Sequence, residues 1–126
     1  MRALLVVDDD EDLRDLVTLV LDLSGRYESV AVGTVEEAIV ELSSVRFDGV
    51  LLDLSLHDGS ANTVLEQLTS RLGGTAVILF TAAIDIDPTL ESSVAGVIRK
   101  PFDPLTLADQ IDALLTDQPV AERSPG

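Results

Sequence analysis

Acidic residues stand directly after two short apolar runs of this chain. Asp8 and Asp9 follow the run 3–7, and Asp53 follows the run 49–52. Short, branched, apolar runs of this kind are typical of buried strands in a parallel sheet. Ligands and reactive groups of such sheets gather beyond the carboxyl ends of the strands, so these carboxylates are candidates for chemistry. Aspartate is also common in loops and helix caps, and the rest of the chain must decide between the two interpretations.

Polar residues that suit phosphoryl chemistry also follow two later candidate strands. Thr81 follows the run 76–80, and Lys100 follows the run 97–99. Crowded carboxylates raise at least one pKa unless a cation is bound, and Mg²⁺ prefers such hard oxygen ligands. With Mg²⁺, an ammonium group and a hydroxyl to neutralise the phosphoryl oxygens, Asp53 could attack a phosphoryl group and form an aspartyl phosphate.

The apolar pattern predicts five strands that alternate with five helices. The strands are expected at 3–7, 28–32, 49–52, 76–80 and 97–99. Right-handed crossovers between them predict an α/β fold with one parallel sheet and helices on both faces. The arrangement expected is a doubly wound (βα)5 flavodoxin-like fold, with a five-stranded parallel sheet of order 2-1-3-4-5. In that order the first and third strands are neighbours, which would bring Asp8, Asp9 and Asp53 together.

Apolar spacing of three and four residues predicts the helix faces that cover this sheet. The stripes are expected at Leu13, Leu16, Val17, Val20 and Leu23; at Val35, Ala38, Ile39 and Leu42; at Val64, Leu65, Leu68 and Leu72; and at Leu107, Ala108, Ile111, Leu114 and Leu115. Thr34 and Glu37 form a capping box for the second helix. Asp103 and Pro104 predict the N-cap and first residue of the last helix. Only a short or ragged helix is expected within 84–96.

Length and composition predict a single cytoplasmic domain. The chain has 126 residues, no cysteine and a formal net charge of −15. An excess of acid repels phosphate backbones and anionic membranes, so no direct nucleic-acid binding and no membrane association are expected. No apolar stretch reaches the roughly 20 residues of a bilayer span, and the early run 3–7 is too short to be expected as a secretory signal. Residues 1–117 are expected to form the domain, and 118–126 a flexible tail or the start of a linker.

In this order and spacing, the motifs VVDDDED, LLDLSLHDG, FTAA and RKPF resemble the receiver domain of two-component response regulators, the CheY-like superfamily. The resemblance covers residues 2–115. It implies that Asp53 is the phosphorylated aspartate and that Asp9 is a direct Mg²⁺ ligand. It also implies that Asp8 is a second acid acting through water, and that the backbone carbonyl of Ser55 is a further protein ligand.

The same resemblance implies a switch and a set of partners. Thr81 corresponds to the hydroxyl that turns toward the phosphoryl group, Lys100 to the lysine that pairs with it, and Lys100-Pro101 to a cis peptide bond. The phosphoryl group would come from a phosphohistidine of a sensor histidine kinase or histidine phosphotransfer protein. A downstream protein or fused output domain would read the changed surface. Such a domain is not an enzyme beyond catalysing its own phosphorylation and dephosphorylation.

Some positions depart from the family pattern. Val97 stands where the family often has an aromatic residue, and His57 where a proline is common; the segment 81–100 also looks short for a full fourth helix. Ser55 and Ala83 occupy the positions that flank the approach of the hydrolytic water. Neither residue carries an acid or amide that could orient this water, so we hypothesise slow self-dephosphorylation.

Other functions compete with this interpretation. Phosphatases of the haloacid dehalogenase type also use an aspartate nucleophile, but they need a second aspartate two residues later, where this chain has Ser55. A flavodoxin-like cofactor site is disfavoured because acids follow the first strand where a phosphate-binding loop needs glycine and hydroxyl residues. A receiver-like binding module that signals without phosphorylation remains the main alternative.

Overall fold

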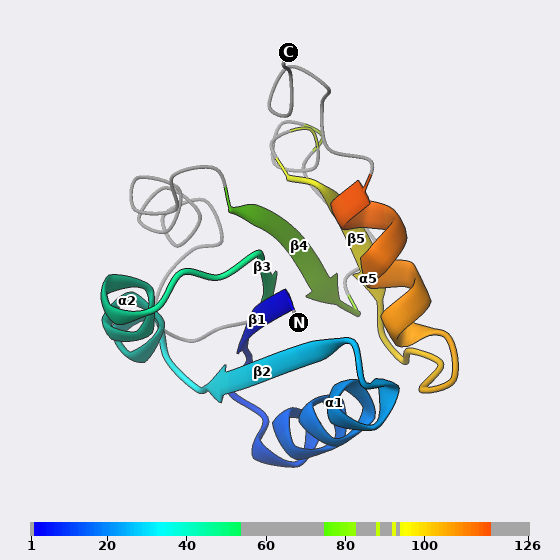
Figure 1. Cartoon of the computed structure of the whole chain (residues 1–126), viewed down its shortest axis with the longest axis horizontal. Coiled ribbons are helices and arrows are strands. Elements are labelled where there is room, and N and C mark those ends of the chain that lie inside the picture. Colours follow the sequence, from blue (N-terminus) through cyan, green and yellow to red (C-terminus); the bar gives the residue numbers. More distant parts are fainter. Residues whose placement is uncertain (1, 54–74, 83–87, 89–91, 93, 117–126) are drawn as a thin grey trace.

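The structure is a computed structural model that describes residues 2–53, 75–82, 88, 92 and 94–116 (Figure 1). Its described strands form one parallel sheet in the order β2-β1-β3-β4-β5. They are β1 (Arg2–Val7), β2 (Tyr27–Val32), β3 (Gly49–Leu52), β4 (Ala76–Thr81) and β5 (Gly96–Arg99). The predicted fold class and strand order are therefore confirmed, and each strand begins and ends within one residue of its predicted bounds.

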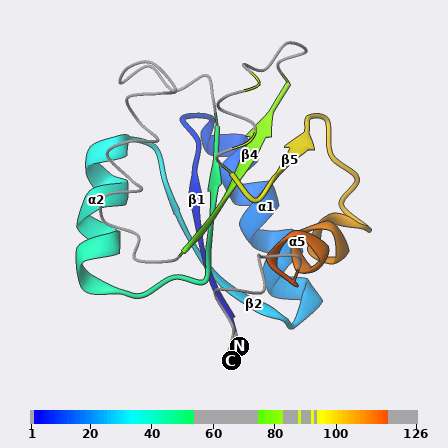
Figure 2. The same cartoon turned by 90° about the horizontal axis from the view of Figure 1, so that it is seen from above.

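Helices cover both faces of this sheet. α2 (Val35–Ser44) lies on one face, and α1 (Glu11–Ser24) and α5 (Leu107–Thr116) lie on the other (Figure 2). The predicted helix with Val64 to Leu72 lies outside the described residues, as does most of the segment 84–96. Within the described ranges, no helix combines the length and the apolar character needed to cross a bilayer.

The core consists of two layers because the side chains of each strand alternate between the two faces of the sheet. On the α2 side, the described core comprises Leu5, Val7, Val32, Val35, Ala38, Phe47, Val50, Leu52, Val77 and Leu79. On the other side it comprises Leu4, Val6, Val17, Leu21, Tyr27, Leu51, Ile78, Phe80, Ile98, Leu107, Ala108 and Ile111. Burial on both faces explains why the central strands read as unbroken apolar runs.

The predicted apolar stripe of α1 was partly wrong. Leu16 and Leu23 are 42% and 76% exposed, whereas Leu21, which the predicted stripe omitted, is fully buried. α1 contacts the core mainly through the buried Val17 and Leu21, which are four residues apart and therefore lie on the same side of the helix. Leu13 and Val20 of the predicted stripe pack beside them, partly buried. The helix carries more leucines than the sheet face can cover, so several apolar spacings fit its sequence and only packing selects one.

The ends of two helices differ in detail from the predicted caps. The Thr34 hydroxyl accepts a hydrogen bond from the Glu37 amide at 3.1 Å, as a capping box requires, but the Glu37 carboxylate reaches the Gly33 amide at 3.0 Å. α5 begins at Leu107 rather than at Pro104. The Asp103 carboxylate accepts from the Leu105 amide at 2.9 Å, so Asp103 caps the turn that precedes α5 instead of the helix itself.

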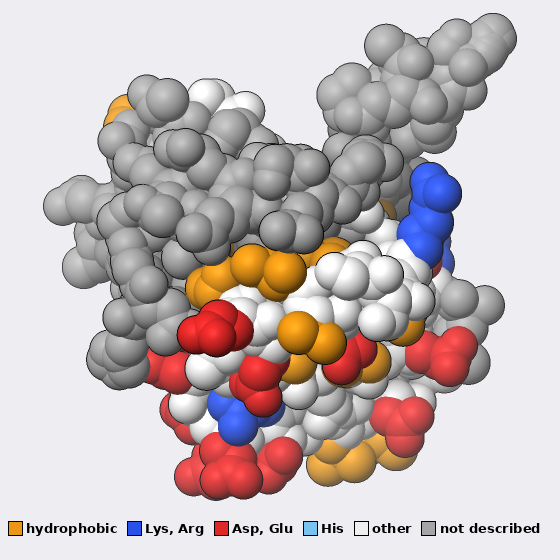
Figure 3. Space-filling view, turned by 90° about the vertical axis from the view of Figure 1, so that its left-hand side faces the viewer, with side chains coloured by type: hydrophobic (Ala, Val, Ile, Leu, Met, Phe, Trp, Pro, Cys, Tyr) orange, Lys and Arg blue, Asp and Glu red, His pale blue; other side chains and the backbone are white. Residues whose placement is uncertain are grey.

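Carboxylates are prominent on the molecular surface. On the side where α2 lies, acidic side chains stand among apolar ones (Figure 3). Glu36 and Glu37 occupy the first turn of α2, where negative charge suits the helix dipole, and Val40 on the same helix is 63% exposed. The described surface thus carries the charge excess that the composition predicted.

Candidate functional site

The register of β1 and β3 brings Asp8 and Asp53 side by side. Val7 pairs with Leu52 as the last pair of these strands, and the Asp53 amide donates to the Val7 carbonyl at 3.0 Å. The Asp8 amide in turn donates to the carbonyl of Val32 at 3.1 Å. Backbone hydrogen bonding therefore continues one residue beyond the strands and holds both aspartates at the same edge of the sheet.

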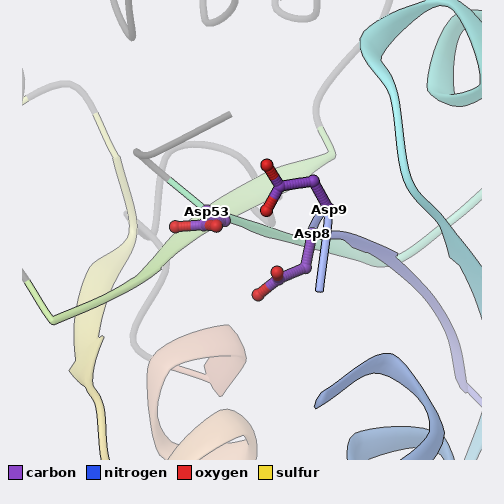
Figure 4. A group of neighbouring side chains, drawn as sticks. All are labelled: Asp8, Asp9 and Asp53. Atoms are coloured by element: carbon purple, nitrogen blue, oxygen red, sulfur yellow. The ribbon is translucent and has the colours of Figure 1, made fainter. Parts of the chain in front are cut away.

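Three carboxylates meet at this edge. Asp8, Asp9 and Asp53 each offer an oxygen, and these oxygens lie within 4.8 Å of one another (Figure 4). The two side chains from the end of β1 extend toward the side where Asp53 lies. The structure thus brings together the three acids that the sequence pattern placed in one group.

Burial distinguishes the members of this group. Asp8 and Asp53 are 1% and 4% exposed, whereas Asp9 faces solvent. Burial raises the pKa of the Asp8 carboxyl, and the charge of Asp53 raises it further, while hydrogen bonds from Lys100 and from the Asp10 amide lower it. The net shift is upward, which means that the protein environment does not fully compensate the negative charge at Asp8.

Lys100 supplies a positive charge to the group. Its Nζ donates to Asp8 Oδ2 at 2.7 Å and lies 3.6 Å from Asp53 Oδ1. The same Nζ lies 5.2 Å from the centre of the Phe80 ring, within the range of a cation–π contact. The Lys100-Pro101 peptide bond is cis, as the resemblance implies. One ammonium faces three carboxylates, so the described group retains an excess of negative charge.

The other predicted site residues lie in different situations. Thr81 ends β4, next to β3 in the sheet, and is 2% exposed; its carbonyl accepts from the Lys100 amide at 2.9 Å. Ser55, His57 and Ala83 lie outside the described residues. Val97 on β5 packs partly buried against the core on the α2 side.

Sequence reasoning missed two residues that contact this group. Phe80 was predicted only as part of a strand, and Arg14 was assigned no role. Arg14 Nη1 donates to the carbonyl oxygen of Asp8 at 2.7 Å. A signal for Arg14 was present, because a basic residue near a helix start is unfavourable with the helix dipole and needs another reason to be there.

The donor set fits a hard divalent cation. Closely spaced, partly buried carboxylates with an uncompensated charge favour binding of a cation, and oxygen ligands of this kind suit Mg²⁺. Asp10, which adjoins the group, has another role: it is the N-cap of α1, and its side chain accepts from the Leu13 amide at 3.2 Å. Asp10 therefore belongs to the start of the helix.

Comparisons with known proteins agree with this geometry. Residues 4–112 match the family described as the response regulator receiver domain. The DNA-binding response regulator MtrA of Mycolicibacterium smegmatis is 32% identical over 99% of this chain and 57% of its own length. The response regulator protein PilR of Pseudomonas aeruginosa is 30% identical over 96% of this chain and 28% of its own length. The chain therefore spans only part of these curated relatives.

Solved structures show the same fold. A CheY-like receiver domain protein from Methanospirillum hungatei superposes with a TM-score of 0.84 at 25% identity, covering 94% of this chain and 96% of that one. A solved complex of histidine kinase ThkA with response regulator protein TrrA contains a chain that superposes with a TM-score of 0.79 at 26% identity. The match covers 91% of this chain and 99% of that chain.

Proposed function

The chain belongs to the response regulator receiver domain family, and on that premise we propose that Asp53 accepts the phosphoryl group. Receiver domains of this family serve phosphorylation-based two-component signalling and are signalling domains rather than enzymes with a separate substrate. One observation carries the proposal: Asp53 directly follows β3, its carboxylate lies together with two others, and Lys100 Nζ is 3.6 Å from its Oδ1. This arrangement matches what phosphoryl transfer to a carboxylate requires.

Asp8, Asp9 and Asp53, together with the backbone carbonyl of Ser55, would hold Mg²⁺. When bound, Mg²⁺ supplies positive charge to the phosphoryl oxygens during transfer. Residues of the chain exclude water and position the acids. Burial of Asp53 keeps bulk water away from the acceptor oxygen, and the β1–β3 register holds Asp8 next to it.

In the proposed step, a carboxylate oxygen of Asp53 attacks the phosphorus of a phosphohistidine. The O–P bond forms, the P–N bond breaks, and its electron pair leaves with the imidazole nitrogen of the donor. Lys100 and the Thr81 hydroxyl then contact the phosphoryl oxygens. Before phosphorylation, Lys100 donates a hydrogen bond to Asp8. Phosphorylation would draw this ammonium toward the phosphoryl oxygens and so shift the population between two states of the interaction surface.

The proposed donor is a sensor histidine kinase or a histidine phosphotransfer protein. A chain of the solved complex of histidine kinase ThkA with response regulator protein TrrA is similar to this one, which supports this choice. MtrA is named as DNA-binding, and the present chain spans 57% of that relative. We infer that the output is a downstream protein or a fused domain, and that the net charge of −15 keeps this domain itself off nucleic acid. We also propose a cytoplasmic location, with residues 1–117 as the receiver and 118–126 as a tail or linker.

Intact mass spectrometry tests the proposal directly. The chain is incubated with acetyl phosphate and Mg²⁺, beside an Asp53→Asn variant and an EDTA control. A gain of about 80 Da that needs both Asp53 and the metal is expected. A wild-type chain that gains no mass under conditions that label an ordinary receiver would instead favour a binding module that signals without phosphorylation.

A further inference from the structure

Arg14 connects the loop that carries Asp8 and Asp9 to the loop after β2. Its Nη1 donates to the carbonyl oxygen of Asp8 at 2.7 Å, from the second turn of α1. The same guanidinium lies against the backbone at Gly33, between β2 and α2: a Cβ placed on Gly33 would lie 2.9 Å from Arg14 Nη1 and 3.4 Å from Arg14 Cζ. The half-buried arginine therefore spans from the loop after β1 to the loop after β2.

The Asp8 carbonyl belongs to the peptide unit that leads into Asp9. Because a peptide unit is planar, holding this carbonyl also fixes the direction in which the backbone enters Asp9. The amide and the carboxylate of Asp8 are held by other partners, namely the Val32 carbonyl, the Asp10 amide and Lys100. Asp9 is exposed, so core packing does not orient it.

We propose that Arg14 is a positioning residue for the metal-binding carboxylates, holding the Asp8–Asp9 peptide so that Asp9 faces Asp53, with Gly33 leaving the space that its guanidinium needs. This inference rests on the proposed function, in which Asp8 and Asp9 hold Mg²⁺. A guanidinium presents its donors in a rigid planar group, whereas a lysine ammonium is a compact charge on a flexible chain, so lysine is not an equivalent replacement at this position.

Simple charge effects predict the opposite of this proposal, which makes it testable. Removing a positive charge near a cation site should strengthen cation binding by electrostatics alone. Loss of a residue that orients a metal ligand should weaken cation binding. Residues that hydrogen-bond to metal ligands commonly contribute about 10-fold or more in metal affinity. The sign of the change in Mg²⁺ affinity therefore separates the two effects.

Four variants allow the measurement. Arg14→Ala removes the contact, and Arg14→Lys retains a donor without the planar group. Gly33→Ala displaces the guanidinium while leaving Arg14 in the sequence, and among the described glycines only Gly25 has a positive φ, so alanine suits the backbone at Gly33. Arg46→Ala is the matched control, because Arg46 is exposed and precedes β3, at the end of that strand away from Asp53.

The dissociation constant for Mg²⁺ is measured by calorimetry, and the amide resonance of Asp9 is followed by NMR. We expect Arg14→Ala to weaken Mg²⁺ binding about 10-fold, Gly33→Ala to weaken it in the same direction with a similar shift of the Asp9 resonance, and Arg14→Lys to recover part of the affinity. Arg46→Ala should bind Mg²⁺ as the wild type does. Thermal unfolding in EDTA confirms that each variant is folded.

Unchanged or tighter Mg²⁺ binding by Arg14→Ala and Gly33→Ala would overturn the inference while leaving the proposed function intact, provided that the wild type binds Mg²⁺ and is labelled at Asp53. If Arg14→Ala does not fold, the Mg²⁺ affinities of Gly33→Ala and Arg14→Lys decide. Weaker binding than in the wild type supports the inference, and unchanged or tighter binding overturns it. A wild-type chain that binds no Mg²⁺ would overturn both proposals, since Arg14 would then have no metal ligand to position.

Discussion

Lys100 Nζ lies 2.7 Å from an oxygen of Asp8 and 3.6 Å from an oxygen of Asp53, so one ammonium is shared between two buried carboxylates. The shorter contact is to Asp8, although Asp53 is the proposed acceptor. A phosphoryl group on Asp53 would add oxygens that compete with Asp8 for this ammonium. The proposed switch thus begins from an ion pair that already exists within the site.

Removing the ammonium should destabilise the protein in the absence of metal. Lys100→Met would leave Asp8 and Asp53 buried without their cation, and we expect a loss of about 2 kcal/mol in the free energy of unfolding, somewhat below the range for fully buried pairs because Lys100 is partly exposed. Urea unfolding in EDTA measures this. Added Mg²⁺ should restore part of the loss, and equal stability of variant and wild type in EDTA would contradict the prediction.

Removing one of the crowded charges should have the opposite effect. Asp53→Asn retains the side-chain volume but takes away a negative charge that raises the pKa of Asp8. We expect the variant to be more stable than the wild type in EDTA by about 1 kcal/mol, the equivalent of less than one pKa unit. Thermal unfolding at low ionic strength measures the difference. A variant less stable than the wild type would contradict the prediction, because it would mean that nearby groups already compensate the negative charge of Asp53.

Mg²⁺ should stabilise the folded chain by mass action. At a concentration of about 100 times its dissociation constant, a ligand that binds only the folded state adds about 2.7 kcal/mol. The midpoint of thermal unfolding should therefore rise with Mg²⁺ concentration, and it should rise less in Asp53→Asn, which has lost one of the grouped carboxylates. The same rise in both proteins would mean that Mg²⁺ acts elsewhere on the acidic surface.

Tyr27 provides a pH-dependent prediction away from the site. Burial and a hydrogen bond from its hydroxyl to Asp112 raise the pKa of Tyr27 to about 12. In the unfolded chain the group titrates near its ordinary pKa of about 10. Between these values the unfolded state loses its proton first, so stability should fall as pH rises from about 10 to about 12.

This prediction is simple to measure because Tyr27 is the only tyrosine of the chain. Phenolate absorbance reports its titration directly, and urea unfolding across the same pH window reports stability. The Tyr27→Phe variant is the control: it should lose the part of the pH dependence that belongs to the phenol. An ordinary titration near pH 10 in the folded protein would contradict the assignment.

Slow loss of the phosphoryl group is expected from the residues flanking the water's approach. Neither Ser55 nor Ala83 offers an acid or amide to orient a water molecule. After removal of the donor, the mass of the phosphorylated chain should persist well beyond seconds, and Ala83→Asn should shorten that lifetime. Rapid return to the unmodified mass in the wild type would refute the hypothesis.

Local patterns were sufficient for much of the fold. β1, β3 and β4 were predictable because most of each strand is a short apolar run that polar residues follow, and the start of α2 was predictable because Thr34 and Glu37 interact over three residues. The start of α5 was not, because Asp103 and Pro104 suit a helix and a turn equally well. The buried face of α1 was not, because the helix has more leucines than buried positions.

By itself, the sequence determined the order of the elements and the meeting of Asp8, Asp9 and Asp53, since residues that follow neighbouring parallel strands reach the same edge of a sheet. Only the tertiary structure decided which contacts the side chains make there. Lys100 donates to Asp8, 92 residues away in sequence. Arg14 lies on the backbone at Gly33 because α1 and the end of β2 pack together. Such contacts depend on distances between elements, which no local pattern encodes.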